Sequence, residues 1–67
     1  MEKVYKIGDI VKLNEYRKGE NRKRDYVIIN IYKKKGYNMY LCENVKTKIK
    51  STFTDFDQVE VIIWKKN

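Results

Sequence analysis

The sequence contains no histidine, no proline and only one cysteine. The missing histidine removes the commonest general base and the commonest metal ligand. A lone Cys42 can form neither an internal disulfide nor a thiolate metal cluster. These absences disfavour most enzymes and metal proteins, so we expect a non-catalytic protein without a cofactor or a metal site.

Long apolar segments are also missing. No uninterrupted apolar stretch exceeds the four residues of Val61–Trp64, which is far short of the roughly 20 residues that a membrane span requires. The opening residues 1–3 do not begin a signal-peptide pattern. We therefore expect a cytoplasmic protein that does not bind membranes.

Positive charge is abundant in a short chain. The 67 residues include 16 Lys or Arg against 9 Asp or Glu, which gives a formal net charge of +7. A chain of this length buries only about 60% of the surface that its unfolded form exposes, which leaves little area for a deep catalytic cleft beside a core. We expect residues 1–67 to form a single domain that is a basic binding module. AT-rich coding sequence also favours lysine, so part of the excess has an explanation without a ligand.

The abundance of β-branched and aromatic residues, together with the absence of alanine, favours an all-β fold. Alternating apolar positions predict five strands, with tight turns between the second, third and fourth. The predicted strands cover residues 4–13, 26–32, 37–44, 48–54 and 59–64. Residues 14–24 show no apolar periodicity and carry many charges, so we expect a long loop that is mobile at its tip.

The alternation also predicts which side chains face the core. Gly8-Asp9 should interrupt the first strand with a bulge or bend. Residues 26–32 are apolar on both faces, with Val27, Ile29 and Ile31 on one and Tyr26, Ile28 and Tyr32 on the other. The inward face of residues 37–44 is either Tyr37, Met39 and Leu41 or Tyr40 and Cys42. The inward residues of the first and fourth strands are Tyr5, Ile7, Val11, Leu13, Ile49, Ser51 and Phe53. A short 3₁₀ turn before the last strand should tuck Phe56 under the sheet.

Two stretches resemble the opening and the ending of the SH3-like small barrels of the Tudor-like and KOW-like kind. Residues 5–13 (YKIGDIVKL) match an opening of an aromatic, a spacer, an apolar residue, Gly-Asp and Val, and residues 53–62 match an ending in which a 3₁₀ turn delivers the last strand. The resemblance implies a five-stranded SH3-like barrel and a non-catalytic module that binds nucleic acid, ribosomal components, modified basic tails or peptides. Residues 22–25 stand where KOW barrels carry G-x-x-G-x-V. In its short length and its high content of lysine and asparagine, the chain resembles small barrels of AT-rich Gram-positive bacteria and their phages.

The densest positive charge lies in residues 14–24 and in the turn after the second strand. If the long loop lies beside the following hairpin tip, these cations share one rim that can bind phosphates. Two tyrosines flank the same rim and are candidates for stacking on bases. The predicted nucleic-acid-binding residues are Arg17, Lys18, Arg22, Lys23, Arg24, Lys33, Lys34, Lys35, Tyr16 and Tyr37. The alternative is a solvated loop whose charge serves solubility and is partly offset by Glu15, Glu20 and Asp25.

Other polar residues have an ordinary structural interpretation. The lysines at 46, 48 and 50 share a strand face, where lysine commonly protects an exposed edge from aggregation, although they would also extend the rim. Cys42 is expected to be a small buried hydrophobic residue. Asp55 and Asp57 lie in a cap-and-turn segment, which favours capping over acid–base chemistry.

Two functional hypotheses follow from the charge and the fold. The first is a module that binds DNA or RNA through phosphates with weak sequence preference. The second is a protein-interaction module that docks on an acidic surface of a larger enzyme. An exposed barrel edge together with Trp64 would also allow a homodimer.

Overall fold

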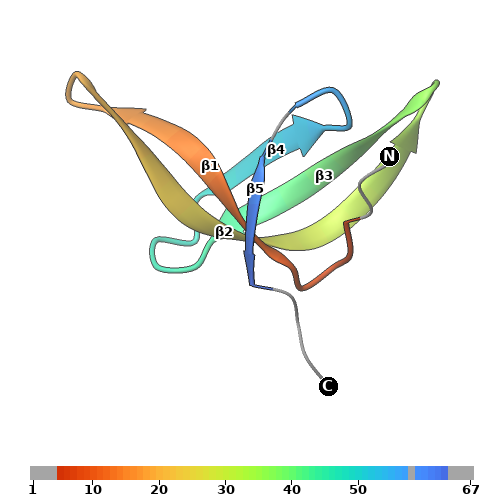
Figure 1. Ribbon diagram of the computed structural model, residues 1–67, viewed down its shortest axis with the longest axis horizontal. Helices are drawn as coiled ribbons and strands as arrows, with labels where there is room; N and C mark the ends of the chain where they lie inside the picture. The colour runs from red at the N-terminus through yellow and green to blue at the C-terminus, as the bar shows by residue number, and fades with distance from the viewer. Residues whose placement is uncertain (1–4, 58, 64–67) are drawn as a thin grey trace.

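The computed structural model describes residues 5–57 and 59–63, which form five strands and no helix (Figure 1). The strands are β1 (Ile10–Arg17), β2 (Glu20–Lys34), β3 (Tyr37–Asn44), β4 (Lys50–Thr54) and β5 (Glu60–Ile63). The prediction of an all-β fold is confirmed, and Trp64 lies outside the described residues. Within the described ranges, no helix long and apolar enough to cross a bilayer is present.

The strands form one antiparallel sheet in the order β4-β3-β2-β1-β5. Strands β1 to β4 pair with their neighbours in the chain, whereas β5 returns to pair with β1 through Ile10↔Ile63 and Val11↔Val61. No ladder in the described part of the chain joins the two edge strands, β4 and β5. The sheet is therefore open, and the finer prediction of a closed five-stranded barrel is not confirmed.

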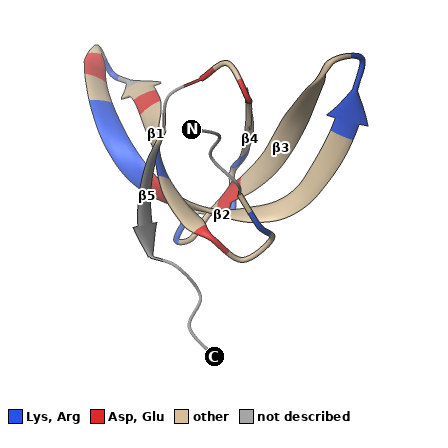
Figure 2. Cartoon of the chain, turned by 45° about the vertical axis from the view of Figure 1, so that its right-hand side comes forward, with Lys and Arg blue, Asp and Glu red and all other residues tan. Residues whose placement is uncertain are grey.

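The long strand β2 gives the sheet its shape. Its 15 residues pair with β1 over the first part and with β3 over the second. A β-bulge at Ile29 shifts the register of the β2–β3 ladder, and bulges bend the strand that carries them. Figures 1 and 2 show the β1–β2 and β2–β3 hairpins rising at opposite sides of the molecule.

The prediction of a long mobile loop over residues 14–24 is wrong. These residues continue β1 and β2 as a hairpin whose last pair is Arg17↔Glu20. The two turn residues, Lys18 and Gly19, both have positive φ, at 49° and 77°. Positive φ at both positions is the type I′ signature, which matches the twist of the flanking strands. We call the part of this hairpin formed by residues 14–24 the hairpin arm.

The core lies on one face of the sheet and has an aromatic cluster at its centre. The Phe53 ring stacks on Tyr40 with centroids 4.8 Å apart, and the Tyr5 ring meets both edge-on at 5.2 and 5.0 Å. The inward face of β3 is therefore the one with Tyr40 and Cys42. Cys42 is 0% exposed in this core, which confirms its expected role as a buried hydrophobic residue, and this burial raises the pKa of its thiol to about 12. The buried residues of the core are Tyr5, Val11, Leu13, Tyr26, Ile28, Tyr40, Cys42 and Phe53.

Some predicted inward side chains instead face solvent. Ile7 is exposed, because Gly8 adopts a φ of 103° and the extended strand begins only afterwards. Ile31 packs against the core and Tyr32 is 44% exposed. The bulge at Ile29 causes this change, because one extra residue reverses the alternation that follows it. Ile49 is exposed as well and precedes β4.

The segment after β4 is a hydrogen-bonded turn. Thr54 O accepts from Asp57 N at 3.0 Å, and Thr54 N donates to Asp57 Oδ2 at 2.8 Å. Phe56 in this turn is 77% exposed, so its predicted position under the sheet is wrong. The Phe56 ring points outward because Asp55 and Asp57, and not Phe56, attach the turn to β3 and β4.

Asp55 connects this turn to β3 and predicts an acid-dependent loss of stability. Its Oδ2 accepts from Asn38 N at 2.7 Å and its Oδ1 from the Tyr40 hydroxyl at 2.6 Å. These bonds, with that from Tyr40 the strongest influence, hold the pKa of Asp55 below its ordinary value of 3.8. The folded state thus favours the charged carboxylate, so its contribution to stability is complete above pH 3.8 and is lost as the pH falls through the lower folded-state pKa.

Urea unfolding across the acid range tests this linkage. Tyr40→Phe removes the strongest of these hydrogen bonds and keeps the ring, so the stability of the variant should depend less on pH below about 4 than that of the wild type. Asp55→Asn should remove this part of the pH dependence altogether. An identical acid profile for all three proteins would contradict the assignment.

Candidate nucleic-acid interface

The structure separates the predicted rim into two groups of cations. One group lies on the hairpin arm, at the start of β2, and the other, Lys33–Lys35, lies at the opposite end of β2. In Figure 2 the two groups appear as blue segments on separate arms, with further blue segments in the turns at the base of the molecule. The expectation of a single shared rim is wrong, because residues 14–24 extend away from the β2–β3 turn as paired strands and do not fold back towards it. Tyr16 belongs to the first group and Tyr37 to the second.

The hairpin arm has two faces, which the cross-strand pairs define. The pairs Leu13↔Arg24 and Glu15↔Arg22 lie on the side that continues the core. The alternate pairs lie on the opposite side, since successive side chains point to opposite faces of a strand. These alternate pairs are Lys12↔Asp25, Asn14↔Lys23 and Tyr16↔Asn21. The arm therefore carries cations on both faces.

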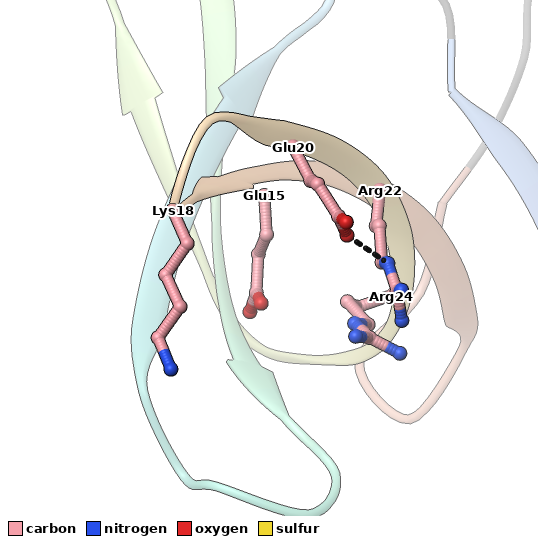
Figure 3. A pocket seen from close by; sticks show the side chains of 5 residues that line it. All are labelled: Glu15, Lys18, Glu20, Arg22 and Arg24. Carbon is pink, nitrogen blue, oxygen red and sulfur yellow. Dashed lines mark hydrogen bonds and ion pairs between the residues drawn. The ribbon is translucent and has the colours of Figure 1, made fainter.

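A hollow on the core side of the arm has mixed charge. Figure 3 shows the side chains that line it, which are Glu15, Lys18, Glu20, Arg22 and Arg24. Arg22 Nε donates to Glu20 Oε1 at 2.8 Å. Glu15 Oε2 accepts from the Tyr26 hydroxyl and from Asn44 Nδ2, the latter at 2.9 Å. Carboxylates thus offset part of the positive charge in this hollow, as the sequence suggested for Glu15 and Glu20.

A second depression lies where the arm meets the β3–β4 turn, residues 45–49. It is lined by Lys12, Lys23, Arg24, Asp25, Asn44, Val45 and Lys46. Val45 N donates to Asp25 O at 3.2 Å, which joins the turn to β2. Asn44 Oδ1 accepts from Lys46 N at 2.8 Å and from Thr47 N at 2.9 Å, which fixes the turn itself.

Three cations at this depression remain available for an anion. Lys12 Nζ lies 3.0 Å from Asp25 Oδ1 and is neutralised by it. Within the described part of the chain, no carboxylate forms an ion pair with Lys23, Arg24 or Lys46. We call these three residues the basic junction. Lys23 and Lys46 come from segments that are far apart in the sequence and are joined by the Val45 to Asp25 backbone bond, while Arg24 lines the depression from the strand face opposite to that of Lys23.

The predicted strand face of lysines 46, 48 and 50 is only partly present. Lys46 lies in the β3–β4 turn, and Lys48 has a positive φ of 67° before β4 begins. Only Lys50 is on β4, where its Nζ lies 3.4 Å from Glu43 Oε2. Asn44 is the residue in the sequence that indicates a turn at Lys46, because an Asn side chain commonly accepts hydrogen bonds from backbone amides two or three residues later.

The second group of cations lies beside aromatic rings. Lys34 pairs with Tyr37 across the β2–β3 hairpin, and the turn between them is Lys35-Gly36. The Tyr37 ring centroid lies 5.6 Å from that of Phe56. Sequence reasoning assigned Phe56 to the core and so missed it as a neighbour of Tyr37. Arg17 was also predicted to bind nucleic acid, but its side chain lies outside the described part of the structure.

Comparison of the chain with protein-family models, with curated proteins and with solved structures finds no match. In the ranges that the structure describes, no group of three or more His, Cys, Asp or Glu side chains is placed to hold a metal ion. The geometry and charge of the two basic groups are therefore the features of the molecule that bear on its function.

Proposed function

We propose that this protein is a small basic module that binds nucleic acid through phosphate contacts, with weak sequence preference, and that the basic junction is its main contact. The observation that supports this proposal is that Lys23, Arg24 and Lys46 line one depression and form no ion pair with a carboxylate among the described residues. Arg and Lys side chains form strong charge-assisted hydrogen bonds with phosphate oxygens. Lys18 extends the same positive charge along the arm.

We also propose that the sheet is a variant of the SH3-like barrel that residues 5–13 and 53–62 resemble. Support comes from five antiparallel strands in which β1 to β4 form a meander and β5 returns to β1. In this arrangement the hairpin arm occupies the position expected for the long first loop. The phosphate-binding surface would then lie on the hairpin arm, which projects from the barrel, and the core of the barrel would be unaffected.

The salt dependence of binding tests the phosphate contacts. If Lys18 and the basic junction neutralise about four phosphates, log K should fall with log salt with a slope of about −3 for a single strand and about −4 for a duplex. Fluorescence anisotropy with labelled DNA and RNA oligonucleotides, at salt concentrations between about 50 and 200 mM, measures this slope. No binding at the lowest salt would overturn the proposal and leave docking on an acidic protein surface as the function to test.

A matched pair of double variants tests the position of the site. Lys23→Gln/Lys46→Gln removes two charges from the basic junction, so the salt slope should become shallower by about 2. Lys6→Gln/Lys50→Gln removes the same charge elsewhere and should leave the slope unchanged. Equal effects of the two double variants would show that net charge alone attracts the nucleic acid, which would overturn the assignment to the junction.

A further inference from the structure

One end of the sheet presents aromatic rings on the side that faces away from the core. Ile31 pairs with the buried Tyr40, so the next pair, Tyr32↔Met39, points to the opposite face, and so does Lys34↔Tyr37. Tyr32 is 44% exposed on this face. Tyr32 and Tyr37 are diagonal neighbours in the ladder, at a distance of about 7–8 Å.

Phe56 extends this surface from the turn after β4. It is 77% exposed, and its ring contacts Tyr37 at a centroid distance of 5.6 Å and an angle of 49°. No other ring contact of Phe56 occurs among the described residues, and it lies outside the core cluster. We call Tyr32, Tyr37 and Phe56 the aromatic face. The exposed Phe56 ring is therefore accessible to an external partner.

The cations next to the aromatic face specify the charge of that partner. Lys34 lies on the same side of the sheet as Tyr37, and Lys35 lies in the adjoining turn. Lys33 lies on the other side with Asn38, and it is close enough to Asp55 to contribute to the low pKa of that carboxyl. Two lysines that form no ion pair with any described carboxylate therefore flank the rings.

The acidic residues nearby are engaged in turn hydrogen bonds. Both Oδ atoms of Asp55 accept from β3, through Asn38 N and the Tyr40 hydroxyl. Asp57 Oδ2 accepts from Thr54 N at 2.8 Å. These bonds orient the carboxylates towards the protein, so the approach over Lys34 and Lys35 is the favourable one for an anion.

We propose that the aromatic face binds unpaired bases of a single-stranded nucleic acid, with Tyr37 and Phe56 stacking on bases while Lys34 and Lys35 bind the adjacent phosphates. The inference rests on the proposed function and specifies its ligand. Stacked base pairs in a duplex cover the flat faces of the bases, whereas a single strand can offer those faces to aromatic side chains. Stacking is tolerant of sequence because every base has a π-face, which agrees with a weak sequence preference.

Binding to a single strand and to a duplex of equal length separates this inference from the proposed function. The probes are a labelled oligo-dT of about 20 nucleotides and a labelled mixed-sequence duplex of about 20 base pairs, each titrated with the full chain. Phe56→Ser should weaken single-strand binding by about tenfold, as expected for the loss of one stacked base, and should leave duplex binding unchanged. Phe56→Tyr keeps a ring at this position and should retain the single-strand affinity.

Lys23→Gln/Lys46→Gln is the reference variant and should weaken the binding of both probes. If that variant loses affinity while Phe56→Ser does not, the aromatic face does not bind bases and the proposed function stands. Equal losses for single strand and duplex in Phe56→Ser would also overturn the inference. An oligo-glutamate peptide of matched charge should compete poorly, and full competition by it would assign the face to an acidic protein. If the wild type binds neither probe, the proposed function fails as well.

Discussion

Replacing Phe53 with alanine is expected to lower the free energy of unfolding by about 3–5 kcal/mol. The Phe53 side chain is only 4% exposed and contacts the rings of Tyr5 and Tyr40. Its removal eliminates both ring contacts and leaves a cavity between β3, β4 and the segment before β1. A single core in a domain of this size rarely supplies more than about 3–5 kcal/mol, so the variant should be largely unfolded at room temperature.

Phe56→Ala is the matched control for this prediction. It removes the same side chain three residues later, from a position that is 77% exposed, and should change the stability by no more than about 0.5 kcal/mol. Urea unfolding followed by circular dichroism measures both variants, with Phe53→Leu as an intermediate case. Similar losses for Phe53→Ala and Phe56→Ala would contradict the described position of the core.

The second large effect is expected at Asn44, whose side chain joins three segments. It is 4% exposed, accepts from Lys46 N and Thr47 N, and donates to Glu15 Oε2. Asn44→Ala would leave two turn amides without this acceptor and would remove one donor from the Glu15 carboxylate. Because each lost bond contributes about 0.5–1.5 kcal/mol, and more where a charge is involved, we expect a total loss of about 2–4 kcal/mol.

Asn21→Ala tests whether this loss is specific to Asn44. Asn21 is an exposed asparagine on the hairpin arm, so its replacement should change the stability by no more than about 0.5 kcal/mol. Thermal and urea unfolding of both variants, followed by circular dichroism, provide the comparison. Equal stability of Asn44→Ala and the wild type would mean that the hairpin arm and the β3–β4 turn do not depend on this side chain.

The strands that line the core could be predicted from the sequence, and the hairpin arm could not. Residues 26–28 and 40–42 alternate between buried and less buried positions, so their apolar pattern indicates extended structure. Residues 14–24 are polar on both faces, and apolar periodicity therefore contains no signal for them. The arm depends on the backbone pairing between its β1 and β2 residues and on the hydrogen bond between Glu15 and Asn44, two residues that are distant in the sequence.

The same reason explains which parts of the candidate site could be predicted. The composition identified the cations, and the apolar alternation along the strands placed Lys34 and Tyr37 beside the β2–β3 turn. It could not show that Lys23 and Lys46 meet, because their proximity follows from the Val45 to Asp25 backbone bond. Nor could it show that the bulge in β2 moves Tyr32 outward, since a bulge inserts one residue without a distinctive residue type.

The arrangement of the ladders has a consequence for the order of folding. β2 joins β1 and β3 through turns of two residues each, so three strands can associate at a small cost in loop-closure entropy. The β1–β5 ladder instead connects Ile10 with Ile63, and this pairing must close a much longer stretch of chain. We therefore expect β5 to dock last during folding, and transient opening of the native sheet to begin with its release from β1.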